Sequence, residues 1–213
     1  MRTPFEPKKL EIDKDKEGLS LKMLTEHFKL YEGYVKKTNE IQEKLETADK
    51  KTANGVYSEY GELKREETFA VNGMKLHEYY FAHLKGDPST SSLDATRDKS
   101  GQAGVPSGEI VKLIERDFGS MEAWKENMIA TGICSRGWAI LAYDFGDMKL
   151  HIYGSDTHNV GAVWNCAVLI AMDVYEHAYF MDYGVDRKTY LDVFFKNMDW
   201  NFVNELITKW KLV

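Results

Sequence analysis

The chain has 213 residues and carries 28 Lys and Arg against 34 Asp and Glu, which gives a formal net charge of −6. A chain of this length buries about 70% of its unfolded surface, enough for one solid core or two small cores that share an interface. The acidic balance disfavours nucleic acid and anionic membranes as partners, because no basic cluster beyond short lysine pairs offsets it. No segment has the uninterrupted apolar length of a membrane span.

The two cysteines, Cys134 and Cys166, belong to no CxxC motif and to no zinc-type cluster. Such a pattern is typical of ordinary thiols in a reducing compartment, and no disulfide is expected. The first residues, MRTPFEPKKLEIDKDKEGLS, have charges where a signal peptide has an apolar core. We therefore expect a cytoplasmic location.

Residues 1–19 contain two prolines and alternating charges, and they predict an arm that lies on the body of the protein. Ser20 is expected to be the N-cap of a long helix, because an apolar stripe with helical spacing follows it. The stripe consists of Leu21, Leu24, His27, Phe28, Tyr31, Tyr34 and Val35. A second helical pattern covers about residues 57–84, with Gly73 inside it as a kink or a close-packing point and His77 on its apolar side.

From residue 85 to residue 108 the composition changes to Gly, Ser, Pro and Asp, which marks a long connection and a domain boundary. We expect an N-terminal domain over residues 1–90, made of the arm and a long helical hairpin. A connection over residues 91–104 leads to a C-terminal α/β domain over residues 105–213. The predicted fold class is therefore α+β.

In the C-terminal part, short helical patterns at about 107–117 and 120–130 precede GWAILAYDFGDMKLHIYG. Its β-prone runs flank FGDM, which predicts an antiparallel hairpin in a small sheet. The mostly apolar run from Val160 to Phe180 is rich in helix formers, so we expect a helix there. A last helical pattern runs from about residue 187 to the end, and no internal repeat is present.

The segment DVYEHAYF places Asp173 and His177 four residues apart. On a helix, residues at i and i+4 share a face with Cβ atoms about 5–6 Å apart, so a carboxylate and an imidazole there could bind one ion. His27 and His77 lie on apolar faces of two further helices. A lone histidine in that position is usually a satisfied core residue. His27, His77 and His177 together with a buried Asp173 are harder to explain in this way, because burying a carboxylate without a partner costs much free energy.

A cation among these four side chains would satisfy all of them. Imidazole and carboxylate ligands without thiolate suit iron or manganese at least as well as zinc. Competing motifs are incomplete: His77 begins HEYYF, but Phe81 stands where the zinc-protease pattern HExxH needs its second His. No histidine has Glu three residues before it, as a carboxylate-bridged di-metal bundle requires, and the GxSxG elbow of hydrolases is absent.

Three segments of the C-terminal half resemble the iron/manganese superoxide dismutase family in order and spacing. They are FGSMEAWKENM, SRGWAILAYD and DVYEHAYFMDYGVDRKTYLDVFFKNMDW, and the similarity runs from about Ser20 to Trp200. They resemble the family's FGS, GxGWxxL, DVWEHAYxxDY and WNxxNW blocks. The third segment departs from the DxWEHAY signature only at Tyr175, where the family usually has Trp.

The resemblance implies a superoxide dismutase that converts superoxide to dioxygen and hydrogen peroxide at one iron or manganese ion per subunit. It implies that the metal ligands are His27, His77, Asp173 and His177, with a water or hydroxide as fifth ligand. These ligands come from both expected domains, so the metal would lie between them. An oxidoreductase of this kind is an antioxidant enzyme.

The resemblance also implies roles for residues around the metal. Tyr34 matches a gateway tyrosine near the substrate funnel, and Trp138 matches a tryptophan that walls the metal pocket. Arg187 matches an arginine that lines the funnel. Glu176 matches a glutamate that reaches across a dimer to the ligand His of the other subunit, so at least a homodimer is implied.

Several positions depart from the family pattern. Tyr34 is seven positions after His27, an interval one residue shorter than in most members, although two helical turns still keep both on one face. Tyr31 stands where the family commonly has a second His. Phe180 stands where it has a cross-dimer Tyr, so both ends of one polar contact change together.

The family usually supplies a glutamine beside the metal-bound solvent from one of two places. Gly73 occupies the first and cannot donate, so His158 is our candidate for the second, as an imidazole expected to change charge near neutrality. His83 and His151 are expected to be structural or surface residues.

The sequence does not distinguish iron from manganese as the metal, nor a dimer from a tetramer as the assembly. The alternative to an active enzyme is a superoxide-dismutase-like protein that binds metal or dimerises without the chemistry.

Overall fold

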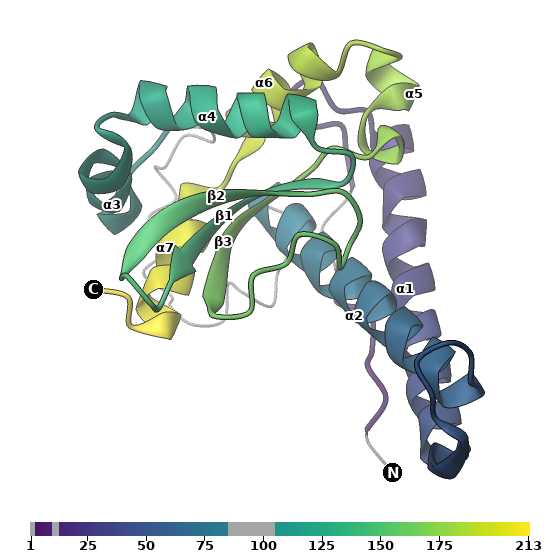
Figure 1. Ribbon diagram of the computed structural model, residues 1–213. Coiled ribbons are helices and arrows are strands. Elements are labelled where there is room, and N and C mark those ends of the chain that lie inside the picture. The colour runs from purple at the N-terminus through teal and green to yellow at the C-terminus, as the bar shows by residue number, and fades with distance from the viewer. Residues whose placement is uncertain (1–2, 10–12, 85–104) are drawn as a thin grey trace.

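The computed structural model describes residues 3–9, 13–84 and 105–213. Its N-terminal part is a hairpin of two long helices, α1 (Leu21–Thr47) and α2 (Glu59–His83), joined through the short 3-10 helix η1 (Lys50–Thr52). Figure 1 shows the joined ends of the two helices projecting away from the sheet. Serine side chains cap both helices: Ser20 accepts from the amide of Met23 and Ser58 from that of Gly61. The N-cap expected at Ser20 is confirmed.

The described part of the N-terminal arm lies on the body of the protein, as the sequence predicts, and its first part contacts α1. The amide of Phe5 donates to the side chain of Asn39 at 2.8 Å, and the amide of Lys8 donates to the hydroxyl of Tyr31 at 2.8 Å. The helix α1 is regular throughout, so His27 and Tyr34 stay two turns apart on one face.

The C-terminal part begins with α3 (Glu109–Phe118) and α4 (Met121–Cys134). The expected hairpin follows as β1 (Trp138–Asp144) and β2 (Lys149–Ser155), paired antiparallel, and β3 (Cys166–Asp173) pairs antiparallel with the other side of β1. The sheet order is therefore β2-β1-β3. In Figure 1, α4 covers one face of this sheet, and α2 approaches from the side of β3. The predicted α+β class with a small antiparallel sheet is confirmed.

The helix expected over residues 160–180 is wrong. This segment forms strand β3, then the 3-10 helix η3 (Glu176–Ala178) and the one-turn helix α5 (Phe180–Tyr183). Most of β3 is buried. A buried strand presents a continuous apolar run whose periodicity cannot be told from that of a buried helix. Asp173 and His177 therefore do not share a helix face; Asp173 ends the strand and a tight turn brings His177 back to it.

The single helical pattern expected from residue 187 to the end is two helices. They are α6 (Arg187–Asn197) and α7 (Trp200–Trp210), separated where Asp199 caps α7 by accepting from the amide of Asn201. The expected connection over residues 91–104 lies outside the described residues, so the domain boundary stays a prediction. Among the helices of the described ranges, none is long and apolar enough to cross a bilayer.

Buried side chains from both parts of the chain form one contiguous hydrophobic cluster. Leu24 and Phe81 of the helical hairpin belong to it together with Trp138 and Leu169 of the sheet. The hairpin and the C-terminal part therefore share one core across their interface. Polar groups placed at this interface must satisfy one another or bind a ligand.

Candidate metal centre

Four side chains from four elements converge at this interface. His27 comes from α1, His77 from α2, Asp173 from the end of β3 and His177 from η3. The Nε2 atoms of His27, His77 and His177 lie 3.2, 3.5 and 3.2 Å from Oδ2 of Asp173. One atom from each side chain falls in a group whose members lie within 4.8 Å of one another. The structure thus brings together all four residues that the sequence suggested as ligands.

Neighbouring hydrogen bonds orient two of these side chains. Nδ1 of His77 lies 2.6 Å from the carbonyl oxygen of Gly73, which can only accept, so Nδ1 carries the proton and Nε2 a lone pair. That Nε2 has no hydrogen-bond partner within the described ranges. The other oxygen of Asp173, Oδ1, accepts from the amide of Tyr175 at 2.9 Å. A buried lone pair and a buried carboxylate oxygen therefore face the same point.

Burial and mutual charge set the protonation states of the group. Burial lowers the pKa of His27 and lowers that of His77 further, which favours neutral imidazoles. Burial alone would raise the pKa of Asp173, but His177 and His27 hold it well below its ordinary value through charge and hydrogen bonds. Burial alone would lower the pKa of His177, but Asp173 raises it.

Neutral imidazoles and an ionised carboxylate are the forms that bind a cation. Mixed nitrogen and oxygen ligation without thiolate suits first-row metals such as iron and manganese. The side chains of His27, His77 and Asp173 are closed to solvent, whereas that of His177 is 26% exposed. The residues present therefore fit a single metal ion, and the group is open to water on the His177 side.

A chain of hydrogen bonds lies beside the group. Nε1 of Trp138 donates to Nδ1 of His158 at 3.0 Å, and Nε2 of His158 lies 2.8 Å from the hydroxyl of Tyr34. Because Nδ1 of His158 accepts, its proton is on Nε2, which donates to the oxygen of Tyr34. Burial lowers the pKa of His158 to about 4. The expectation that His158 changes charge near neutrality is therefore wrong; buried against aromatic rings, it is neutral at pH 7.

Because Gly73 has no side chain, the ring of Tyr34 can pack directly against the backbone of α2. A Cβ atom on Gly73 would lie 2.8 Å from Cδ1 of Tyr34, closer than real contacts allow, so any larger residue would displace the ring. The helix α2 is continuous there, which makes Gly73 a close-packing point and not a kink. Burial raises the pKa of Tyr34, and the charge of Asp173 adds to this, so the phenol keeps its proton at neutral pH.

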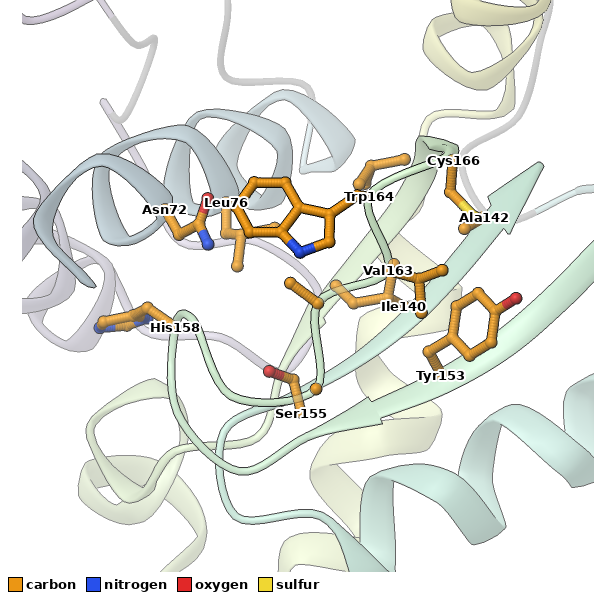
Figure 2. A pocket seen from close by; sticks show the side chains of 13 residues that line it. Asn72, Leu76, Ile140, Ala142, Tyr153, Ser155, His158, Val163, Trp164 and Cys166 are labelled. Carbon is orange, nitrogen blue, oxygen red and sulfur yellow. The ribbon is translucent and has the colours of Figure 1, made fainter. Parts of the chain in front are cut away.

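Behind His158 an apolar cavity of about 190 Å³ lies between α2 and the sheet. Figure 2 shows His158 at one end of this cavity and Cys166 at the other, with the indole of Trp164 above it. Trp164 is 88% exposed, whereas His158 is only 2% exposed. The imidazole of His158 thus has an apolar space on one side and Tyr34 on the other.

Glu176 and Arg187 line a surface cavity of about 420 Å³ together with Tyr179 and Phe180. Nε of Arg187 donates to the hydroxyl of Tyr179 at 3.1 Å, and a terminal nitrogen donates to the carbonyl oxygen of Ser135 at 2.8 Å. Phe180 beside them is 55% exposed. These contacts hold Arg187 at the end of α4, and the expected roles of Arg187 at a funnel and Glu176 across a dimer stay predictions.

From the sequence, Tyr175 was noted only as a departure from the family signature, and its contacts were not predicted. Its ring stacks on His177 at 5.2 Å and lies 5.1 Å from His158, while its amide binds Asp173. Tyr190 was missed altogether, although its hydroxyl donates to the carbonyl oxygen of Asp173 at 2.7 Å. Tyr190 lies in an ordinary apolar helical pattern, so nothing in the sequence distinguishes it from other core aromatics.

The remaining histidines behave as the sequence suggested. His83 is fully buried and His151 lies in the hairpin, where its Nε2 is 2.8 Å from a carboxylate oxygen of Asp147. The hydroxyl of Tyr31 faces the N-terminal arm and Glu78, not the four-residue group. Glu78 is likewise turned away from the group, towards Lys8, so it is not placed to act as a base there.

The fold and the four-residue group define a class of protein: a helical hairpin packed on an α/β unit, with a group of three His and one Asp between them that could hold a metal ion. The chain belongs to the iron/manganese superoxide dismutase family. Residues 106–206 match the family model described as "Iron/manganese superoxide dismutases, C-terminal domain".

Relatives that match along nearly the whole chain agree with this family. "Superoxide dismutase [Fe]" of Aquifex aeolicus is 44% identical over 91% of this chain and 86% of its own length. "Superoxide dismutase [Fe]" of Aquifex pyrophilus is 42% identical over 96% of this chain and 92% of its own. "Superoxide dismutase [Mn] 2" of Haloferax volcanii is 31% identical over 94% and 93%. Both metals therefore occur among the names of its relatives.

Proposed function

We propose that this protein is a superoxide dismutase, an oxidoreductase that converts two superoxide ions and two protons into dioxygen and hydrogen peroxide. The observation that carries the proposal is the convergence of three imidazole nitrogens on one oxygen of Asp173, at 3.2, 3.5 and 3.2 Å. His27, His77, Asp173 and His177 would hold one iron or manganese ion per subunit. Such an ion supplies the one-electron oxidation and reduction that dismutation requires.

The chain's own residues would supply position and protons. The Gly73 carbonyl holds the ring of His77, and the amide of Tyr175 holds Asp173, so both are fixed before an ion arrives. Tyr34 keeps its proton at neutral pH and accepts from Nε2 of His158, which makes the pair a proton relay at the edge of the site. Because Nδ1 of His158 accepts from Trp138 and the proton on Nε2 is donated to Tyr34, His158 would act on solvent at the metal through Tyr34 and not as its direct donor.

Substrate access and assembly belong to the proposal as well. Superoxide is an anion, and the chain is acidic overall, so approach depends on local positive charge. Arg187, which lines the surface cavity together with Lys188 and Glu176, would supply it. Glu176 would reach the partner's metal site in a homodimer or a tetramer built from such dimers. A cytoplasmic location is proposed with it, on the ground of two cysteines without disulfide spacing.

The test is reconstitution of the metal-free protein with iron and with manganese separately. Metal content is measured by elemental analysis, and superoxide removal is measured on the same samples after pulse generation of superoxide. One ion per chain with rapid superoxide removal in at least one form is expected. Stoichiometric metal without superoxide removal in either form would favour the altered, non-catalytic relative, and a protein that binds neither metal would overturn both assignments.

A further inference from the structure

The last residue of α2 is a buried histidine that the proposed function does not use. His83 lies six residues after His77 and is fully buried. Its ring packs against Phe202 at 5.0 Å and Phe194 at 6.2 Å, which belong to α7 and α6. A residue of the helical hairpin is therefore enclosed by the C-terminal part of the protein.

His83 meets the free edge of strand β3. In the order β2-β1-β3 this strand pairs with β1 on one side, so its outer main-chain groups need other partners. The amide of Ala171 donates to Nε2 of His83 at 3.3 Å, and the carbonyl oxygen of Asp173 accepts from Tyr190 at 2.7 Å. Two side chains thus complete the edge of β3 where a further strand would otherwise bind.

The contact requires a particular form of the imidazole. A main-chain amide can only donate, so Nε2 of His83 must be unprotonated, and the single proton of the neutral ring is on Nδ1. The carbonyl oxygen of His83 accepts from the amide of Asp199 at 2.7 Å. The same residue therefore fixes the end of α2 against both β3 and the start of α7.

This contact joins two elements that each carry a member of the four-residue group. Ala171 is two residues before Asp173 on β3, and His83 follows His77 on α2. The distance between Nε2 of His77 and Oδ2 of Asp173, 3.5 Å, depends on how α2 and β3 are spaced. The hydroxyl of Tyr80, also on α2, lies 3.4 Å from the hydroxyl of Tyr190. This longer contact is a weaker second link between α2 and the edge of β3.

We propose that His83 is a positioning residue: by accepting the amide of Ala171, it fixes strand β3 against helix α2 and so sets the spacing between Asp173 and His77. The inference rests on the proposed metal-binding role of these two residues. The expected effect is pre-organisation of the site. Ligands that are already in place when the ion arrives cost less conformational entropy on binding it.

The test compares His83→Phe with His83→Gln in the full-length protein. Phe fills the space but cannot accept, which leaves the amide of Ala171 buried without a partner, whereas the amide oxygen of Gln reaches about as far as Nε2. Two quantities are measured: hydrogen exchange of the β3 segment in the metal-free protein, and release of manganese to a chelator from the loaded protein. His151→Phe, which changes a histidine of the hairpin, is the matched control.

We expect His83→Phe to speed both exchange and manganese release by about tenfold, the effect of losing one buried hydrogen bond. His83→Gln should restore both to near the wild-type values, and His151→Phe should change neither. If His83→Phe does not fold, His83→Asn replaces it, because the shorter amide cannot reach Ala171. Normal exchange and release in that variant would overturn the proposal, and so would a Gln variant as impaired as the Phe variant, since the ring would then act by packing alone.

These readouts separate the proposal from the proposed function. Exchange in the metal-free protein needs neither metal nor activity, and manganese release needs no superoxide. A protein that loads manganese but fails to remove superoxide would refute the enzyme assignment and leave the role of His83 standing. A His83→Phe variant that removes superoxide rapidly and releases manganese at the wild-type rate would refute the role of His83 and leave the enzyme assignment standing.

Discussion

The indole of Trp138 and the imidazole of His158 form a hydrogen bond that decides where the proton of His158 is. Nε1 of Trp138 can only donate, and it does so to Nδ1 of His158 at 3.0 Å. The opposite nitrogen, Nε2, therefore carries the proton and points it at Tyr34. A residue at the start of β1 thus sets the direction of a hydrogen bond on the far side of the imidazole ring.

Trp138→Phe should remove this control over the tautomer. Without the indole donor, the neutral ring of His158 can carry its proton on either nitrogen, so the population with the proton on Nε2 should fall. Nitrogen chemical shifts of the metal-free protein distinguish the two tautomers. Trp210→Phe, at the exposed end of α7, is the control. A variant that keeps the wild-type tautomer would show that something other than Trp138 fixes it.

His158→Gln should keep the relay, whereas His158→Leu should break it. The glutamine oxygen can accept from Trp138 and its nitrogen can donate to Tyr34, but leucine can do neither. We expect both variants to bind metal normally, and the Leu variant to lose turnover by about tenfold or more, the scale of a lost proton-transfer group. Turnover at saturating superoxide, with metal content on the same samples, is the measurement. Equal turnover of the two variants would remove His158 from the relay.

Asp173→Asn should abolish tight metal binding. It removes the one anionic member of the four-residue group while keeping its shape, so three neutral imidazoles would have to hold a multivalent cation. Elemental analysis after dialysis should show little metal, and superoxide removal should disappear with it. Asp192→Asn, which breaks only an ion pair with Lys125 on the surface, should leave both unchanged. Full metal occupancy in Asp173→Asn would refute the ligand assignment.

Glu176→Ala should weaken dimerisation and metal retention together, if the glutamate reaches the partner's His177. Analytical ultracentrifugation over a range of concentrations measures the first, and metal content after dialysis measures the second. Glu126→Ala, an exposed change on α4, is the control. A variant that remains a fully metallated dimer of wild-type affinity would mean that Glu176 serves only its own subunit.

Acid should destabilise the metal-free protein through His83. Burial lowers the pKa of His83 to about 3, below its ordinary value of 6.5, so the unfolded chain binds a proton that the folded chain excludes. Stability is therefore retained above pH 6.5 and is lost as the pH falls towards 3, by about 1.4 kcal/mol per pH unit within this window.

His83→Gln has no such titration. Between pH 7 and pH 5 its free energy of unfolding should fall by about 2 kcal/mol less than that of the wild type. Urea unfolding of both metal-free proteins at pH 7, 6 and 5 measures the difference. Parallel pH dependences would show that His83 takes up a proton as readily in the folded protein as in the unfolded chain.

The sequence predicted the elements that fold locally and missed one that depends on pairing. The cap at Ser20, the apolar stripe through His27 and the FGDM hairpin are local signals, and the structure agrees with each. Strand β3 was expected to be helical, because a continuous apolar run is compatible with a buried helix and with a buried strand. Only pairing with strand β1 decides between the two.

The four-residue group was predicted in full even though the helix that was meant to join Asp173 and His177 does not exist. The residue types sufficed for the prediction, and the geometry comes from the turn after β3. The tautomer of His158, the edge contact of His83 and the hydroxyl of Tyr190 could not be predicted, because each depends on a distant main-chain or side-chain group.

Asp173 and His27 are 146 residues apart in the chain, although their side chains touch. A ribosome adds about 5–20 residues per second, so the carboxylate emerges on the order of ten seconds after the first imidazole. Throughout that interval the nascent chain offers His27, and then His77, without the carboxylate of Asp173, and neutral imidazoles alone hold iron or manganese weakly. Under the proposed function, the complete set of ligands, and with it any selection between the two metals, therefore exists only once β3 has reached α2.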